Sequence, residues 1–182
     1  MNPPVEPDPV PVPVASASAQ RGALRVEGED VVGRPAIEVG RWCEVALTAL
    51  EAEAVPAGRI DLHFVDIDDI TQLNSEHLDG TGPTDVLSFP YEQDPRSSVL
   101  AAGAGAEPVV LGDIVICAEV AARQAPDHAG SLDSELALLV VHGVLHVLGW
   151  DHAEPGEAVV MQDREAEILS RAGFEFRHPA RR

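Results

Sequence analysis

The sequence predicts an α+β fold, in which a small mixed sheet of three to four strands packs against about five helices. One observation is the segment 59–66, where apolar and polar residues alternate as in a half-buried strand. A second is the β-branched, largely apolar run 109–117, which is typical of a buried central strand. A third is a set of longer segments with apolar residues at helical spacing. Strands mixed with helices indicate a layered fold.

Length and composition indicate one domain. A chain of 182 residues is the size of about one domain. Its hydrophobic fraction of 45% is ample for a core, and an aromatic fraction of only 4% predicts aliphatic packing. Residues 1–22 are expected to form a disordered, proline-rich tail, because proline removes donors and favours extended chain. The folded domain is expected at 23–176, with a short basic end at 177–182.

The first half of the domain carries clear start and stop signals. Pro35 suits the first turn of a helix, where its missing N–H has no partner to lose. Asp68 or Asp69 can cap the next helix. The expected elements are a strand at 24–27, a helix from 35 to about 54, a strand at 59–66, a helix reaching Leu78 and a short strand ending at Pro90.

The second half is expected to contain the central strand and three helices. A loop at 91–108 precedes the strand 109–117, and a short helix follows it to about Gln124. Ser131 can cap a central helix that is apolar nearly all round and therefore buried. A final helix should run from Pro155 to about Ala172. Its expected core residues are Val159, Val160, Ile168 and Leu169.

Charge and cysteine content narrow the classes of function. The net charge is −19, and all 12 basic residues are arginine. Such an acidic surface repels phosphate backbones and argues against broad nonspecific nucleic-acid binding. Cys43 and Cys117 form no CxxC pair and are expected to be core thiols. With no signal peptide and no apolar run of about 18 residues, a cytoplasmic location without membrane contact is expected.

The segment 140–152 concentrates the chemistry of the chain. His142, His146 and His152 follow the pattern His-x3-His-x5-His. On a helix, the first two lie one turn apart on one face. Gly149 suits a helix end with a left-handed residue, so that the chain can bring His152 back to the other two. Three convergent nitrogens with an open fourth position are typical of a catalytic rather than a structural zinc site.

The run His142-Gly143-x-Leu145-His146-x-x-Gly149-x-Asp151-His152 resembles the YbeY family of bacterial zinc-dependent endoribonucleases, which act in ribosomal RNA maturation. Leu73-Asn74 with 83–90, and the run Leu-Gly-Asp-Ile-x-Ile at 111–116, carry the same resemblance. It covers roughly residues 60–170. It implies a small sheet with helices packed on it, and one Zn²⁺ per chain held in a cleft by the three histidines.

Two departures from known patterns matter. Metzincin proteases share the histidine spacing but place a glutamate directly after the first histidine as general base. This chain has Gly143 there, and glycine cannot move a proton. Members of the YbeY family often have Tyr-Arg, with an arginine associated with RNA cleavage, where this chain has His77-Leu78. Arg59 or Arg96 is the candidate substitute for that phosphate contact.

Further site residues are expected around the zinc. Asp85 is the candidate catalytic acid or base, with a loop hydrogen bond as its alternative role. Asp113, near the end of a strand, is a second acid–base candidate. Asp151 can orient a ligand imidazole by accepting its other N–H. Ser88 is a candidate for contact with substrate or for a hydrogen bond that completes the strand end. His63 and His128 are expected to be exposed.

The predicted function is a zinc hydrolase domain at 23–176 that cleaves single-stranded RNA. The resemblance implies a role in 16S rRNA maturation and in ribosome assembly and quality control, with the ribosomal subunit or its proteins as partners. Zinc held by three neutral imidazoles lowers the pKa of its water to about 7. Two alternatives stay open: a zinc peptidase, and a ribosome-assembly binding protein whose metal is mainly structural.

Overall fold

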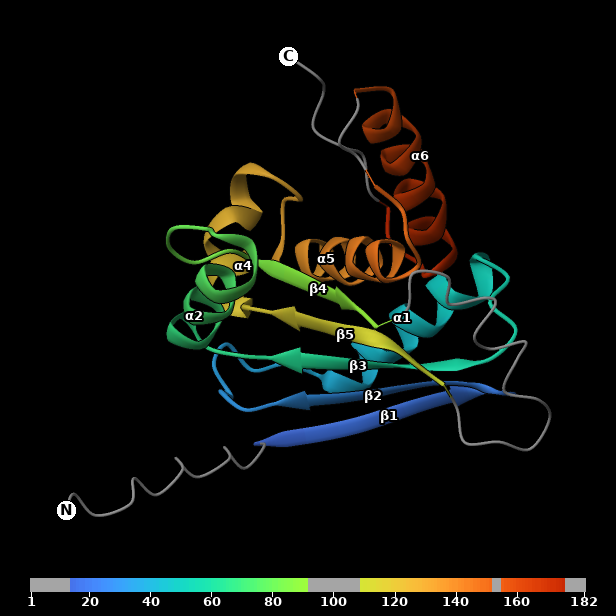
Figure 1. Ribbon diagram of the computed structural model, residues 1–182, viewed down its shortest axis with the longest axis horizontal. Helices are drawn as coiled ribbons and strands as arrows, with labels where there is room; N and C mark the ends of the chain where they lie inside the picture. Colours follow the sequence, from blue (N-terminus) through green and yellow to red (C-terminus); the bar gives the residue numbers. More distant parts are fainter. Residues whose placement is uncertain (1–13, 92–108, 152–154, 176–182) are drawn as a thin grey trace.

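The structure is a computed structural model, and it describes residues 14–91, 109–151 and 155–175. Five strands form one mixed sheet in the order β1-β2-β3-β5-β4 (Figure 1). The strands are β1 (Ala15–Arg21), β2 (Leu24–Asp30), β3 (Gly58–Phe64), β4 (Val86–Pro90) and β5 (Val110–Ile116). The three central strands are parallel, and β1 and β4 are antiparallel to their neighbours at the two edges. The α+β class is confirmed, with five strands where three to four were predicted.

Helices cover the two faces of the sheet unequally. They are α1 (Val39–Ala52), α2 (Ile67–Leu78), α4 (Ala118–Gln124), α5 (Leu132–Val147) and α6 (Pro155–Arg171). Figure 1 shows α1 and α5 on one face, with α6 packed beyond them. α2 covers one end of the other face, where Ile70 packs with Leu87 and Val115. The rest of that second face, called here the polar face, carries the alternating side chains Glu27, Glu29, Asp61 and His63.

Helix α5 lies at the centre of the core. Ser131 caps it as predicted, because its Oγ accepts the N–H of Ser134 at 3.1 Å. Eleven of its 16 residues are buried, in agreement with the all-round apolar pattern. Gly143 lets the helix approach the sheet closely, since a Cβ there would lie 2.7 Å from Cγ2 of Ile114 on β5. This close contact sets the distance between α5 and the sheet, and therefore the position of the histidines on α5.

The predicted tail at 1–22 is wrong in its second half. Residues 15–21 form the edge strand β1, which pairs along its whole length with β2. A two-residue turn at Gly22-Ala23, with Gly22 at φ +60°, reverses the chain between them. Alanine and serine have little strand propensity, so the pairing with β2 rather than local preference makes this strand. Residues 1–13 lie outside the described ranges, as does the basic end 177–182.

The remaining elements are confirmed with shifted ends, but α1 begins at Val39, so Pro35 precedes the helix and does not lie in its first turn. The cap of α2 is Asp66 rather than Asp68 or Asp69, because its Oδ1 accepts the N–H of Asp69 at 2.8 Å. On α6, Val160 is 57% exposed and so is not a core residue, whereas Ile168 and Leu169 are fully buried. The predicted loop at 91–108 is described only at Tyr91.

The described residues also bear on the two cysteines and on membrane-spanning helices. Cys43 and Cys117 are free and buried, as expected of core thiols. In the described part of the chain, no single helix is long and apolar enough to cross a membrane. One pair of helices, Ala118–Asp127 and Leu132–Val147, passes on length and composition only when taken together, with a bend of 113°.

Candidate metal centre and active-site cavity

His142 and His146 lie one turn apart on α5 and point their rings at one another. The two Nε2 atoms are 3.0 Å apart. Nδ1 of His142 lies 2.7 Å from Oε1 of Glu165 on α6, a side chain that is only 3% exposed. Nδ1 of His146 lies 2.9 Å from the carbonyl oxygen of Trp150. Each ring is therefore held on its outer side by an oxygen, and its Nε2 faces inward.

These contacts decide which nitrogen can bind a metal. A carbonyl oxygen only accepts, so the contact with Trp150 requires a proton on Nδ1 of His146. An ionised Glu165 sets the same tautomer for His142. Both Nε2 atoms then present lone pairs toward the same point, an arrangement that a cation stabilises. Zinc with nitrogen ligands at 2.0–2.1 Å in tetrahedral geometry would separate them by roughly 3.3 Å. The donor set fits a zinc ion, with Glu165 and the Trp150 carbonyl as the usual outer partners.

The third predicted ligand, His152, lies outside the described residues, so the full ligand set stays a prediction. Within the described ranges, no group of three or more His, Cys, Asp or Glu side chains is arranged to hold a metal. The chain does turn back as expected after α5. Gly149 has φ +88°, its N–H donates to the carbonyl of His146, and Trp150 N–H donates to that of Leu145. This is a Schellman motif, for which a left-handed glycine is suited.

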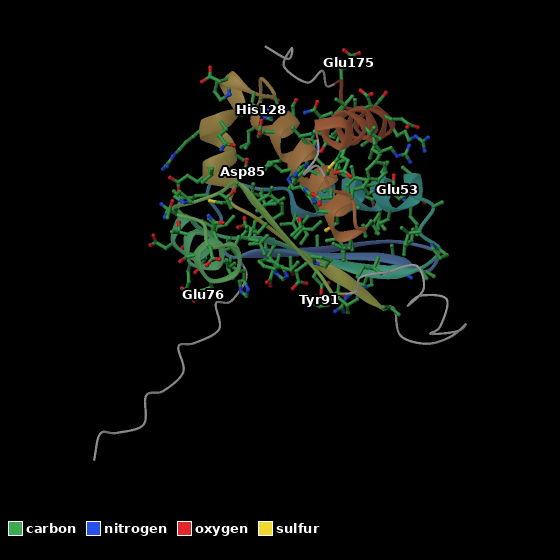
Figure 2. The ribbon with its side chains drawn as sticks, turned by 45° about the horizontal axis from the view of Figure 1, so that its top comes forward. Glu53, Glu76, Asp85, Tyr91, His128 and Glu175 are labelled. Carbon is green, nitrogen blue, oxygen red and sulfur yellow. The ribbon has the colours of Figure 1, made fainter. Side chains whose placement is uncertain are left out.

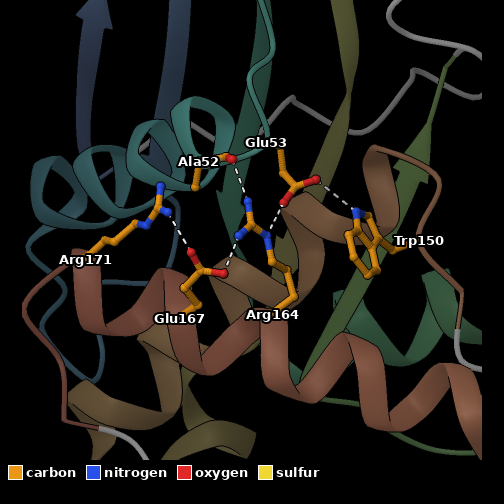
Figure 3. A network of polar contacts seen from close by, with 6 residues as sticks. All are labelled: Ala52, Glu53, Trp150, Arg164, Glu167 and Arg171. Carbon is orange, nitrogen blue, oxygen red and sulfur yellow. Dashed lines mark hydrogen bonds and ion pairs between the residues drawn. The ribbon is translucent and has the colours of Figure 1, made fainter.

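A polar network anchors this turn to helix α1 (Figure 3). Glu53, only 7% exposed, accepts the indole N–H of Trp150 at 3.1 Å and Nε–H of Arg164 at 2.6 Å. Arg164 also donates to the carbonyl of Ala52 at 2.5 Å and to Glu167. Trp150 therefore makes two contacts in the site: its indole N–H donates to Glu53, and its backbone carbonyl oxygen contacts Nδ1 of His146. Position 53 is 97 residues from position 150 in sequence, so only the fold brings them together.

A cavity of about 300 Å³ opens beside His142, between α5, α6 and the start of β4. Asp85 and His128 line it together with His142 and Glu165, and Figure 2 shows the first two close to one another beside α5. Nδ1 of His128 lies 2.9 and 3.0 Å from the two carboxylate oxygens of Glu135, a fully buried residue. His128 is exposed at its ring, as expected, but this contact fixes its orientation.

The structure brings Asp85 to the candidate site, where it also has its alternative role. Its Oδ1 accepts the N–H of Val86 at 2.9 Å and the hydroxyl of Thr84 at 3.2 Å. Ser88 shares the face of β4 with Val86, the face toward α5. Asp151 is exposed in the turn after α5. Leu78, where the resemblance leads one to expect an arginine, is 64% exposed at the end of α2.

Asp113 lies on the opposite side of the sheet from the histidines. Its neighbour Ile114 faces Gly143 of α5, so alternation along β5 turns Asp113 to the polar face. There it accepts the hydroxyl of Tyr91 at 2.6 Å and approaches His63. Burial works against its charge, but the nearby His63 and the hydrogen bond from Tyr91 prevail and lower the pKa of Asp113, while the bond to Asp113 raises the pKa of Tyr91 to about 12. Arg59, one of the two candidate phosphate contacts, is on the same face and paired with Asp61 at 3.0 Å, and the other candidate, Arg96, lies outside the described residues.

Sequence reasoning missed Glu165, Glu135 and Glu53. For Glu165 a signal was present, because this carboxylate falls between Met161 and Ile168 on the apolar stripe of α6. A charged residue in a core stripe requires a partner. Glu135 likewise lies on the apolar α5, seven residues before His142. For Glu53, at the end of α1, the sequence carried no comparable signal.

The fold and the site together define an α+β protein with a histidine-based candidate metal centre beside a small cavity. A family model described as Endoribonuclease YbeY matches residues 33–173. The chain therefore belongs to the YbeY family of endoribonucleases, which are hydrolases of phosphodiester bonds.

Relatives extend over most of the chain. An Endoribonuclease YbeY of Salinispora tropica is 46% identical over 129 residues, which are 69% of this chain and 82% of that protein. One of Nocardia farcinica is 38% identical over 165 residues, 90% of this chain and 83% of that protein. A solution structure of TM1509 from Thermotoga maritima aligns with a TM-score of 0.49 and 20% identity, covering 87% of this chain and 99% of that chain.

Proposed function

We propose that this protein is a zinc-dependent endoribonuclease that cleaves single-stranded RNA in the cavity beside His142. The observation that carries the proposal is the pair of Nε2 atoms 3.0 Å apart, each with its Nδ1 bonded to an oxygen. His142 and His146, with His152 as the predicted third ligand, would hold one Zn²⁺. Bound zinc supplies a water of lowered pKa and a positive charge for the phosphate oxygens of the transition state.

The side chains of this chain divide the remaining work. Glu165 and the carbonyl of Trp150 keep the two imidazoles in the tautomer that leaves Nε2 unprotonated. Asp85 lines the same cavity as His142 and is the proposed group that accepts or donates a proton at the reacting oxygens. Asp151 and Ser88 remain candidates for orienting a ligand and for contacting the strand of RNA.

A cavity of about 300 Å³ favours single-stranded over double-stranded RNA. It has room for parts of one nucleotide but not for a duplex. Accessible single strands can be splayed so that one nucleotide enters while its neighbours stay outside. The reaction proposed here therefore acts at loops or unpaired ends.

The peptidase alternative is disfavoured by space as well as by chemistry. Gly143 stands where a metzincin has its glutamate, and it carries no acid–base group. A Cβ at this position would already lie 2.7 Å from Cγ2 and 3.2 Å from Cδ1 of Ile114. A glutamate could not be placed there without moving α5 away from β5.

The charge of the chain bears on how RNA is recruited. Of the eight arginines in the described ranges, seven are paired with carboxylates. With a net charge of −19, long-range attraction of phosphate is weak. We therefore propose that ribosomal proteins or the assembling small subunit present the substrate, 16S rRNA, in the cytoplasm. Tight binding of naked rRNA at physiological salt would contradict this part of the proposal.

A second candidate function is a ribosome-assembly factor whose metal is mainly structural. The exposed Leu78 at the position of the family arginine favours it, because a leucine cannot contact phosphate. A metal-loaded ribonuclease should cut RNA, whereas a metal-loaded assembly factor should not.

The experiment that tests the proposed function is cleavage of a labelled single-stranded RNA by wild type and His146→Ala, with metal content read on the same samples. We expect metal-dependent cutting by wild type and loss of both metal and cutting in the variant. A Leu78→Arg variant, which restores the arginine expected from the family, tests the phosphate contact of that arginine. We expect this variant to cut RNA faster than wild type. A zinc-loaded wild type that cuts neither naked RNA nor ribosomal precursors would overturn the proposal in favour of the assembly factor.

A further inference from the structure

The cavity beside His142 has a second histidine on its wall, and this histidine is held as firmly as the first. His142 is bonded to the buried Glu165, and His128 is bonded to the buried Glu135. Glu135 and His142 are seven residues apart on α5, which is two turns and roughly 10 Å along one face. The metal centre accounts for His142 but assigns nothing to His128.

His128 is held by a buried carboxylate and not by a solvent-exposed partner. Glu135 is 0% exposed, and burying a carboxylate carries a desolvation penalty that only good partners offset. Its described partners are Nδ1 of His128, at 2.9 and 3.0 Å from its two oxygens, and the N–H of Ala129 at 3.2 Å. The side chain is 41% exposed, so part of the ring is accessible.

The rest of the wall matches the faces and edges of a nucleobase. Val86, Leu138, Leu139 and Met161 provide apolar surface on which a flat ring can pack. Gln162 can both donate and accept at the edge of a base, and the imidazole of His128 can add one polar contact. Asp85 and Glu165 also line the cavity, and their charge would disfavour a phosphate group except where the metal ion offsets it. Away from the metal, a neutral heterocycle fits this lining better than a phosphate does.

We propose that this cavity is a binding site for one unstacked nucleobase of the RNA strand, adjacent to the cleaved bond, and that His128 contacts it. The proposal rests on the proposed ribonuclease function and adds a subsite to it. Insertion of a base also explains how an acidic chain with paired arginines can hold a single strand. Base packing on side chains supports binding without phosphate contacts.

The first test measures binding without cleavage. The zinc-loaded full chain is mixed with each of the four nucleoside 5′-monophosphates, which contain no phosphodiester bond, and ligand protons are followed by saturation-transfer NMR. Base protons are expected to receive more saturation than ribose protons. Ala158→Leu, which fills the cavity from α6, should abolish the effect. Val160→Leu, a change on the 57% exposed side of the same helix, is the matched control and should preserve it.

The second test measures selectivity during cleavage of a randomised single-stranded RNA. Wild type should show a preference of about tenfold at one position next to the cut, the effect of one or two neutral hydrogen bonds. His128→Gln, whose amide can still donate to Glu135, should reduce that preference with unchanged zinc content. Ala158→Leu should remove it. Thermal unfolding of each variant confirms that it is folded.

The outcomes separate the subsite from the ribonuclease activity. Cleavage by wild type without base preference, together with no saturation of base protons, overturns the subsite and leaves the ribonuclease standing. Saturation that Ala158→Leu abolishes, in a protein that cuts no RNA, overturns the ribonuclease and retains a nucleotide site. Saturation that Ala158→Leu leaves intact places the nucleotide elsewhere and overturns the subsite.

Discussion

Removing one N–H from Trp150 should weaken metal binding at His146, although the contact that is lost is the one between the indole and Glu53. Trp150→Phe keeps an aromatic ring in the turn and deletes the donor that lies 3.1 Å from Oε2 of Glu53. The carboxylate keeps its bond to Arg164 at 2.6 Å, so its charge stays paired. The substitution therefore tests one link of the network without leaving a buried charge alone.

The size of the effect follows from the contact that is lost. A hydrogen bond to a charged group contributes about 1.5–3 kcal/mol, and the partly buried position of Trp150 argues for the lower end. Backbone bonds of the Schellman motif still hold the turn, so only part of this change reaches the Trp150 carbonyl. Direct outer partners of metal ligands change affinity by 10–100-fold. For this indirect one we expect a loss of about 3–10-fold in zinc affinity.

Zinc affinity is measured by competition with a chromogenic chelator, and the free energy of unfolding by urea titration of the metal-free protein. Glu167→Gln is the matched control, because it breaks contacts of Arg164 and Arg171 at the other end of the same network. It should leave zinc affinity unchanged. If Trp150→Phe lowers stability but binds zinc as tightly as wild type, the turn is positioned by its backbone alone and the reasoning about Glu53 is refuted.

The other predictions concern the metal, the core and pH. His142→Ala and His146→Ala should each lose zinc affinity by more than about 100-fold; stoichiometric zinc in either variant removes that residue from the site. Gly143→Ala should lower the free energy of unfolding by about 1–3 kcal/mol, because its Cβ would press on Ile114, whereas Gly156→Ala, with nothing within 4 Å, should not destabilise. Burial raises the pKa of Cys43 to about 11, so a thiol reagent should label it only as fast as the protein unfolds; rapid labelling of the native protein would contradict this. The nearby carboxylate of Asp113 and the hydrogen bond to Glu29 raise the pKa of His63 despite its partial burial, so its stabilising effect is full below the unfolded pKa of about 6.5 and is lost as pH rises through the folded pKa. Urea midpoints should therefore show a decline over that range that His63→Gln removes, and an identical decline in the variant would disprove the assignment.

The sequence by itself determined the elements whose signals are local. The alternation at 59–66, the apolar run that became β5, the Ser131 cap and the left-handed Gly149 each depend on neighbours within a few residues, and each is found in the structure. The spacing of His142 and His146 belongs to the same class, because helical periodicity alone places them one turn apart. Family membership also follows from the sequence, through motifs that are contiguous in the chain.

Tertiary structure decided what depends on distant partners. β1 is a strand because its backbone pairs with that of β2, not because alanine and serine favour strands. Asp85 and Asp113 look alike in sequence, yet the alternation of β5 against α5 sends Asp113 to the polar face, while Asp85 lines the cavity with His142. Glu165, Glu135 and Glu53 acquire their roles only when helices pack together. A buried carboxylate is stable only beside its donors, and packing selects those donors from anywhere in the chain.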